Sequence, residues 1–467
     1  MMSRRHLTRG QRQPRGMPVK APAQRGAMEN VNVNAAGIDI GATVNLVAVP
    51  EGRDSVTVRS FGTFTADLIA LADWLRSCGV TTVAMESTGI YWIPLYELLE
   101  SRGFEVLLAE PSQIKKVPGR KSDVLDCQWI QRLHSFGLLR GSFRPADVIV
   151  VLRSYLRQRE MLVQGAAAHV QHMQKALELM NVKLTEVLDD ITGLTGRQII
   201  ESILEGERDP VRLAKLRDPK CKHGEETIAL ALQGNWRDEH LFALRQGLEL
   251  CRVYQQKLHE LDQQIEAHLK SISAACVMPP EPLRPRPAGR RKKSRNEPVF
   301  DLRSLLHRLS AVDLTTINGI GPHAALQLIS EIGTDMSHFP SVKHFCSWLC
   351  LCPGTNKTGG RIRSRSGKTR PSANRAARVL RLCAQSVIRA DCALGAFGRR
   401  LKARLGAPKA VTAVAHKLAK LVYELLSTGR PYTDQGAASY EQRFRDHQLQ
   451  RLTKQALKIG YTLQPAT

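Results

Sequence analysis

The chain has 467 residues, a formal net charge of +25 and a hydrophobic content of 43%. This length allows two or three domains, and the excess of positive charge favours a polyanion as partner. No run of about 20 apolar residues predicts a spanning helix, and the basic N-terminus lacks the apolar segment of a secretory signal. We therefore expect no membrane partner, and a cytoplasmic protein that binds nucleic acid.

The first half of the chain predicts a basic arm followed by an α/β domain. Residues 1–33 are rich in Arg, Gln, Gly and Pro, a composition typical of a disordered arm. Residues 34–147 contain three early strand patterns and then alternate between strand and helix. This order predicts a mixed sheet of the ribonuclease-H or RuvC-like type, in an α/β plus α protein.

The second half predicts helices. Residues 148–276 contain two long helices with heptad-like apolar seams, interrupted in the first by Arg159. They predict an antiparallel coiled-coil arm that joins subunits, and an ordinary helical subdomain is the alternative. Pro, Arg and Lys enrichment predicts a basic linker over residues 277–298. Residues 299–430 predict a mostly helical C-terminal domain, and 431–467 a further helix and tail.

Four carboxylates stand out in the α/β region. Asp39 and Glu86 each lie near the end of an apolar strand pattern, and Asp123 and Asp126 are three residues apart on a predicted helix. Active sites of open α/β sheets lie at the carboxyl ends of the strands, and a buried carboxylate needs a positive partner. Mg²⁺ prefers such oxygen ligands. These four residues are therefore the predicted Mg²⁺ ligands and catalytic acids of a phosphodiester chemistry.

The ten cysteines contain no CxxC pair and predict reduced thiols. His344, Cys346, Cys350 and Cys352 are close together in HFCSWLCLC, but their spacing is not that of a zinc ribbon. We interpret this segment as apolar and packed.

Two motifs in the C-terminal domain predict phosphate binding. INGIGPHAALQLISEIG is typical of a helix-hairpin-helix, in which Gly319 and Gly321 would expose backbone N–H groups to a phosphate. Beyond it, a loop rich in Gly, Ser and Thr is followed by seven cations without an acid among them. These are Arg361, Arg363, Arg365, Lys368, Arg370, Arg375 and Arg378. The loop is either a plain phosphate-binding loop or the site of a hydroxyl nucleophile, for which Thr358, Ser364 and Ser366 are the candidates.

Taken in order, GIDIG, MESTG and KSDVLD, then INGIGPHAALQLISEIG, FCSWLCLCPGTNKTGGRI and NRAARVLRLCA, resemble the DEDD transposases of insertion sequences. These are bridge-RNA-guided recombinases, and the resemblance covers most of residues 34–430. It implies a RuvC-like domain whose acids bind Mg²⁺ and assist from a neighbouring subunit, in a homo-oligomer (dimer or tetramer). It also implies a serine nucleophile that becomes covalently attached to DNA, and a guide RNA that pairs with donor and target DNA.

The family's serine position falls on Thr358, which keeps the hydroxyl but is β-branched and more crowded. Either Thr358 replaces the serine, or a nearby serine acts, or this copy is impaired. Three alternatives to a recombinase remain: a RuvC-like nuclease that hydrolyses DNA, an ATPase of the actin and sugar-kinase type, and a non-catalytic RNA-binding scaffold. The ATPase would need a second Gly-rich phosphate loop and an adenosine motif, and the sequence contains neither.

Overall fold

The computed structural model describes residues 29–464, apart from residues 88, 115–122, 278–281, 284, 286–296, 355, 359–360 and 365–368. The predicted basic arm at 1–33 and the predicted linker at 277–298 therefore lie largely outside the described residues. The chain divides into two units, residues 1–143 and 144–467.

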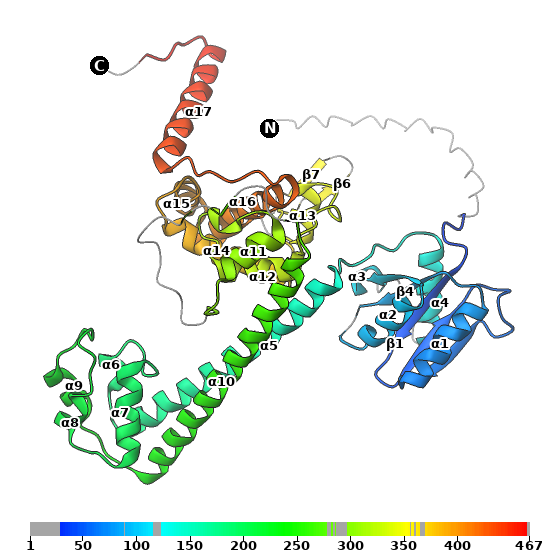
Figure 1. The fold of residues 1–467 in the computed structure, drawn as a ribbon. Coiled ribbons are helices and arrows are strands. Elements are labelled where there is room, and N and C mark those ends of the chain that lie inside the picture. The colour runs from blue at the N-terminus through cyan, green and yellow to red at the C-terminus, as the bar shows by residue number, and fades with distance from the viewer. Residues whose placement is uncertain are drawn as a thin grey trace, which may run out of the picture. The chain divides into compact units, whose positions relative to one another are not determined.

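The N-terminal unit is built on a five-stranded mixed sheet of order β3-β2-β1-β4-β5 (Figure 1). Three strands form an antiparallel meander: β1 (Ala35–Ile40), β2 (Val44–Ala48) and β3 (Val58–Gly62). Two more strands run parallel to β1: β4 (Thr82–Glu86) and β5 (Glu105–Ala109). This order confirms the RuvC-like mixed sheet that the strand and helix patterns predict.

Helices cover both faces of this sheet. On one face, α1 (Thr65–Ser77) and α2 (Trp92–Ser101) pack on apolar side chains of the strands, with Ile38 and Leu71 fully buried. On the other face, α4 (Asp123–Ser135) lies over smaller residues, and Ala84 packs beside Ile130. The short α3 (Pro111–Ile114) adds Ile114 to this second core. Because side chains alternate along a strand, odd-numbered residues of β1 and even-numbered residues of β4 face α4.

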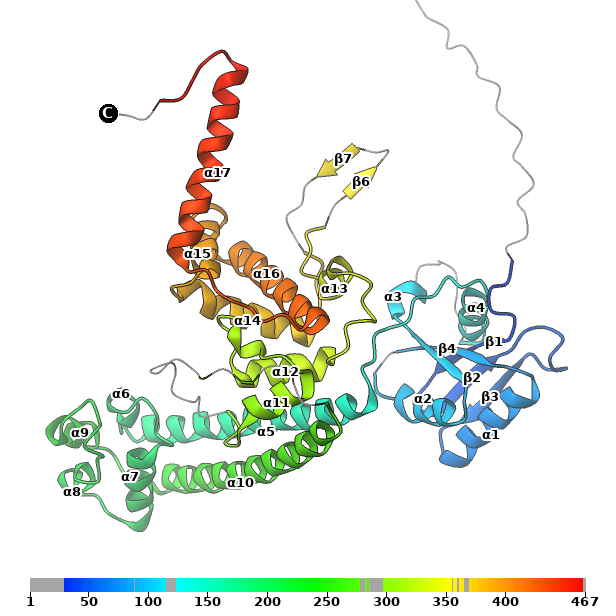
Figure 2. The same ribbon diagram turned by 45° about the horizontal axis from the view of Figure 1, so that its top comes forward.

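The C-terminal unit begins with two long helices, α5 (Asp147–Leu179) and α10 (Asp238–Ala274), which lie side by side in both views (Figures 1 and 2). They are antiparallel, because the His268 ring contacts the Val148 carbonyl at 2.8 Å near one end, and the Cys251 thiol donates to the Ala166 carbonyl at 3.7 Å further along. Four short helices lie between them in sequence: α6 (Leu184–Val187), α7 (Leu194–Glu205), α8 (Pro210–Ala214) and α9 (Glu225–Ala231).

Arg159, the residue that interrupts the apolar seam of α5, is buried against α10. Its guanidinium donates two hydrogen bonds to the Asp262 carboxylate, at 2.6 and 3.1 Å. A bidentate partner compensates for the burial of this charge. The break in the heptad pattern is therefore a cross-helix ion pair within one chain.

The remainder of this unit is mostly helical, as predicted. Its elements are α11 (Leu302–Ser310), the 3-10 turn η1 (Leu314–Thr316), α12 (Pro322–Ile332), α13 (Val342–Trp348), α14 (Arg375–Arg389), α15 (Ala393–Leu405), α16 (Ala407–Thr428) and α17 (Ala437–Lys458). Between α13 and α14 lies a small hairpin that the sequence patterns did not predict, made of β6 (Asn356–Thr358) and β7 (Arg361–Ser364). None of the described helices has the length and apolar content needed to cross a membrane.

The cysteine-rich segment at α13 is packed as predicted. Phe345 and Cys346 are buried, and burial raises the pKa of the Cys346 thiol to about 11. Within the described residues, no three His, Cys, Asp or Glu side chains are arranged to hold a metal ion.

Candidate active site

Asp39 and Glu86 lie at the same end of two neighbouring parallel strands. The last paired residues of β1 and β4 are Ile38 and Met85, and Asp39 and Glu86 are the next residue on each strand. Parallel neighbours are about 4.8 Å apart, and both residues share the face that α4 covers. Both are half-buried. The sheet therefore brings these two predicted acids together at the carboxyl ends of its central strands.

The direction of α4 brings its first turn to the same edge. Near its end, the His134 ring shares a hydrogen bond of 2.8 Å with the Thr82 hydroxyl, at the start of β4. The Gln131 side chain donates to the Ala35 carbonyl, at the start of β1, over 3.3 Å. The C-terminus of α4 is thus fixed at the beginning of both strands, so its N-terminus lies where the strands end.

A glycine allows α4 to lie this close to β1. A Cβ atom at Gly37 would come within 2.2 Å of the Gln131 amide nitrogen and 2.5 Å of the Cys127 carbonyl oxygen. Any larger residue would push the helix from the sheet. Sequence reasoning missed this role, although a glycine inside an apolar strand is a known sign of close backbone approach.

The Cys127 thiol reports on the electrostatics of this edge. Its pKa is raised to about 11, mainly by burial, and the Asp39 and Asp126 carboxylates contribute to this rise by disfavouring a further negative charge. Strand β1 and the first turn of α4 therefore each place a carboxylate near this thiol.

Asp39, Glu86 and Asp126 come from three elements and carry carboxylate oxygens, the ligands that Mg²⁺ prefers. As placed in the described part of the chain, these acids do not form a group of three that could hold a metal ion. Asp123 begins α4, one turn before Asp126, and its side chain is outside the described part of the chain. A carboxylate cluster at a helix N-terminus is also favoured by the helix dipole.

The predicted nucleophile lies in the C-terminal unit, on the hairpin that leaves the helical core after α13. Thr358 is the last residue of β6 and is paired with Arg361 of β7. A single antiparallel β-bridge between Pro353 and Thr369 joins the two chain segments at the base of this hairpin. Leu351, shortly before the bridge, is buried. The hairpin is thus held at its base by the packed core.

The seven predicted phosphate-binding cations have different surroundings. Arg361 and Arg363 lie on β7, Arg365 and Lys368 lie outside the described residues, and Arg370 is exposed just after the base of the hairpin. The last two lie at the start of α14, where Asn374 caps the helix by accepting the Ala377 amide at 3.0 Å.

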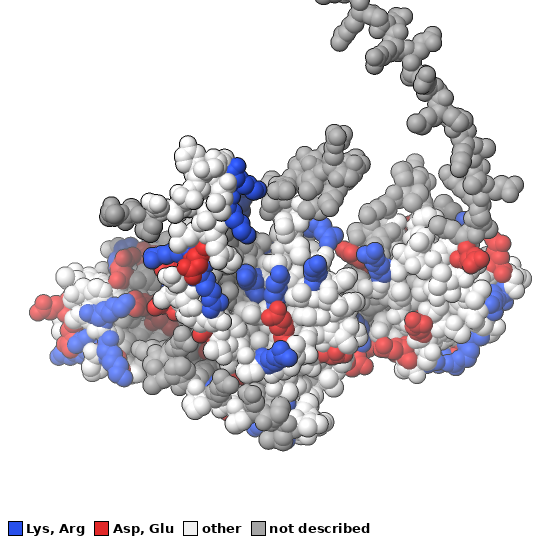
Figure 3. All heavy atoms as spheres, turned by 90° about the horizontal axis from the view of Figure 1, so that it is seen from above, with Lys and Arg blue, Asp and Glu red and all other residues white. Residues whose placement is uncertain are grey.

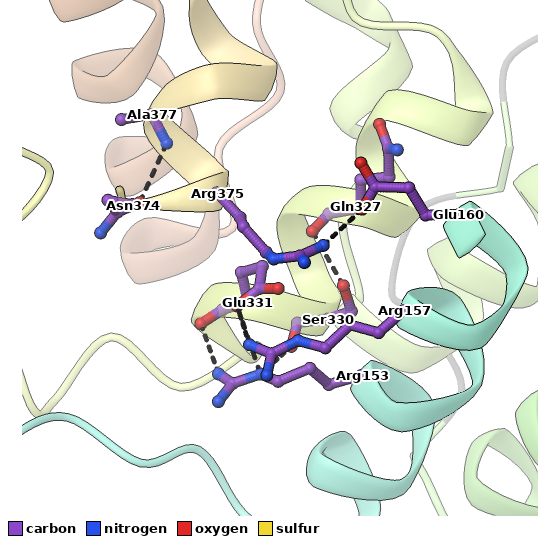
Figure 4. Close-up of polar contacts among 9 residues, drawn as sticks. All are labelled: Arg153, Arg157, Glu160, Gln327, Ser330, Glu331, Asn374, Arg375 and Ala377. Carbon is purple, nitrogen blue, oxygen red and sulfur yellow. Dashed lines mark hydrogen bonds and ion pairs between the residues drawn. The ribbon is translucent and has the colours of Figure 1, made fainter. Parts of the chain in front are cut away.

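Arg375 and Arg378 have an acidic partner that the local sequence did not reveal. Both guanidinium groups donate to the Glu160 carboxylate on α5 (Figure 4 shows Arg375 with Glu160). Hydrogen bonds and charge from the two arginines outweigh the partial burial of Glu160, which by itself would raise its pKa, and leave that pKa below its usual range. Because this acid is more than 200 residues away in sequence, only the fold could reveal it.

The same face of α5 holds the end of α12 (Figure 4). Arg153 donates to the carbonyls of Ser330 and Glu331, at 3.0 and 2.9 Å, and lies 3.3 Å from the Glu331 carboxylate. A cation at a helix C-terminus compensates for its unpaired carbonyls and its dipole. Arg153 and Glu160 therefore fasten the long helices to α12 and α14.

The predicted helix-hairpin-helix turn is present between η1 and α12. Gly319 has a φ of +89°, and a Cβ there would lie 2.2 Å from a methyl carbon of Val387. This glycine is thus required by the turn and by its contact with α14. Gly321 is the residue before α12, and its carbonyl accepts the Ala325 amide at 2.9 Å.

These features together define a RuvC-like α/β domain, with acids at the carboxyl ends of its central strands, followed by a mostly helical region. Comparison with protein families agrees with this class. A transposase model of the DEDD IS110 type matches residues 36–182, and the model described as "Transposase IS116/IS110/IS902 family" matches residues 311–398. The chain belongs to the IS110 family of DEDD transposases. A comparison with curated proteins found no match.

Proposed function

We propose that this transposase cleaves and rejoins DNA through a covalent bond between Thr358 and a DNA phosphate. In this proposal Asp39, Glu86, Asp123 and Asp126 hold Mg²⁺, and a structured RNA guides the protein to donor and target DNA. The observation that carries the proposal is the position of Asp39 beside Glu86 at the end of two parallel strands, with the first turn of α4 at the same edge.

The proposed step conserves the phosphodiester. The Thr358 hydroxyl adds to the scissile phosphorus while the bond to one deoxyribose oxygen breaks, and the hydroxyl proton ends on that leaving oxygen. A free DNA hydroxyl can later attack the protein–phosphate bond and release Thr358. One bond forms for each bond broken, so rejoining needs no external energy source.

The protein side chains have separate roles in this step. The four carboxylates hold the divalent ion, which when bound supplies Lewis-acid stabilisation of charge at the phosphate. The arginines of β7, with Arg370, are suited to hold non-bridging phosphate oxygens. In keeping with the family resemblance, we propose that the protein acts as an oligomer, in which the acids of one subunit would assist at Thr358 of its neighbour.

The test substitutes one acid and measures cleavage and binding separately. Asp39→Asn should abolish strand cleavage and exchange of donor and target duplexes in the presence of Mg²⁺, with DNA affinity within about twofold, because the lost group is a metal ligand and not a phosphate contact. Asp73→Asn is the matched control, since Asp73 is an exposed acid of α1 paired with Arg102 on the other side of the sheet. Retained cleavage by Asp39→Asn would refute the assigned role.

The same assay separates the alternatives. A RuvC-like nuclease would produce hydrolysed ends with no protein–DNA adduct, and a binding scaffold would leave the DNA intact. Omission of the guide RNA should abolish recognition of donor and target sequences, while the sequence-independent affinity for DNA remains.

A further inference from the structure

Helix α17 carries a row of basic side chains along one face, and most of the helix extends beyond the core. Arg443, His447, Arg451, Lys454 and Lys458 lie at positions i, i+4, i+8, i+11 and i+15, a spacing that keeps them on one side of a helix with 3.6 residues per turn. All five are exposed. In the space-filling view, Lys and Arg are the commoner charged groups over the C-terminal helices (Figure 3).

The base of α17 is fixed on α15. The Arg400 guanidinium lies over the rings of both Tyr440 and Phe444, at 4.7 and 3.2 Å from the ring centroids. Phe397 packs edge-on against Tyr440, and the Asp434 carboxylate accepts the first amide of α15 at 3.2 Å. Only the first two turns make these contacts, and no residue of α17 is buried. The rest of the helix extends away from the other helices in both ribbon views (Figures 1 and 2).

The basic side chains in the free part of α17 are not paired with an acid in the described part of the chain. Within the described residues, none of Arg451, Lys454 and Lys458 takes part in an ion pair. The helix also contains Arg445 and only two acids, Glu441 and Asp446. Five Lys or Arg residues against two acids give it a net charge of +3.

We propose that α17 binds the phosphate backbone of B-form duplex DNA through this cationic face and docks along the major groove. The cations from Arg443 to Lys458 extend over about 22 Å at 1.5 Å per residue. A free helix of ordinary diameter fits the major groove of B-DNA, whereas the deep, narrow major groove of A-form RNA does not admit it. This inference rests on the proposed function, because it assigns one contact surface to the DNA substrate.

Two other partners are less suited to this helix. The opposite face carries Leu449, Leu452 and Ile459, which are exposed by 59%, 47% and 72%. Such a short apolar stripe could lie on an anionic lipid surface or pair with a second copy. The chain-wide charge of +25 and the transposase family favour DNA.

The test uses the full-length protein and a triple substitution, Arg451→Gln, Lys454→Gln and Lys458→Gln. Glutamine keeps a good helix propensity, and circular dichroism checks that the helix content is unchanged. Binding to a B-form duplex is measured without Mg²⁺ over a range of salt concentrations. We expect the slope of log affinity against log salt to decrease in magnitude by about 2 to 3, because each lost phosphate contact removes about 0.9. At low salt the affinity should fall at least about tenfold.

A matched control removes the same charge elsewhere. Lys175→Gln, Lys215→Gln and Lys220→Gln changes three exposed lysines of α5 and the segment between the long helices, and should leave the salt slope within about 0.5 of the wild type. An equal loss in both triple variants would mean that only net charge matters, and would overturn the proposal.

Three further outcomes would also overturn it: an unchanged slope for the α17 variant, a loss confined to structured RNA, and a loss confined to phosphatidylserine vesicles with DNA binding intact. A wild-type protein that does not bind duplex DNA would refute the proposed function itself. Normal wild-type binding with an unaffected α17 variant would refute only this inference.

Discussion

Gly37 in β1 lies directly against Gln131 in α4, so closely that a Cβ atom at residue 37 would come within 2.2 Å of the Gln131 amide nitrogen. Such a Cβ atom would meet the Gln131 amide nitrogen and the Cys127 carbonyl oxygen, and both of these are backbone atoms that cannot rotate away. This contact sets the depth at which α4 lies on the sheet, and with it the distance from Asp126 to Asp39.

Gly37→Ala should therefore impair both stability and catalysis. Overpacking of this kind costs about 1–3 kcal/mol, and the shift of α4 should separate the acids and abolish strand exchange even in the folded fraction. Urea unfolding and an exchange assay measure the two effects. Gly141→Ala is the control, since its Cβ would meet only a Leu107 side-chain carbon at 3.8 Å. Normal exchange by a folded Gly37→Ala protein would show that α4 does not position the acids.

Glu160→Gln should release Arg375 and Arg378 from their carboxylate. If these arginines bind DNA phosphates, the neutral amide competes less and affinity should rise, by less than about fivefold because such partly exposed ion pairs are weak. A filter-binding titration of wild type and variant at one salt concentration measures this. Glu178→Gln, which removes an exposed acid of the same helix that pairs with Lys183, controls for net charge. An equal or lower affinity than the control would indicate that the two arginines serve only to fasten α14 to α5.

His134 should make the N-terminal unit sensitive to acid. Burial lowers the pKa of the His134 ring in the folded protein, so the unfolded chain takes up the proton more readily below about pH 6.5. The associated stability is complete above that pH and is lost as the pH falls toward the folded-state pKa. The same His134 ring makes the hydrogen bond with the Thr82 hydroxyl that fixes the end of α4.

His134→Gln should remove this dependence. We expect the wild type to lose more unfolding free energy than the variant between about pH 7.5 and about pH 5, as measured by urea unfolding. His416, whose pKa burial also lowers, is present in both proteins and cancels in the comparison. Parallel pH profiles would mean that His134 does not titrate with unfolding.

Local patterns were sufficient to predict the sheet and the long helices. The alternation of apolar residues around Asp39 and Glu86 correctly predicted strands that end near these acids, because side-chain periodicity is a property of neighbouring residues. The heptad seam likewise predicted α5 and α10. The tight packing at Gly37 and the pairing of Arg159 with Asp262 depend on residues about 90 and 103 positions apart, and no local pattern contains that information.

Local sequence patterns were also insufficient to predict the contacts of the C-terminal site. A run of cations without a nearby acid predicted seven phosphate contacts, but Glu160 lies 215 residues from Arg375 and binds it in the fold. The β6–β7 hairpin escaped prediction because its strands are three and four residues long and rich in polar residues, so they lack the apolar alternation that identifies strands.

The most direct test of the central claim is to trap and map a covalent protein–DNA adduct. Wild-type protein, Mg²⁺, guide RNA and labelled DNA are combined, the products are denatured, and the modified peptide is identified by mass. We predict an adduct at Thr358 that disappears in Thr358→Ala, persists or increases in Thr358→Ser, where the hydroxyl is less crowded, and is absent in Asp39→Asn. An adduct that survives Thr358→Ala and maps to Ser364 or Ser366 would contradict the assigned nucleophile, and DNA cleavage without any adduct would contradict the covalent mechanism.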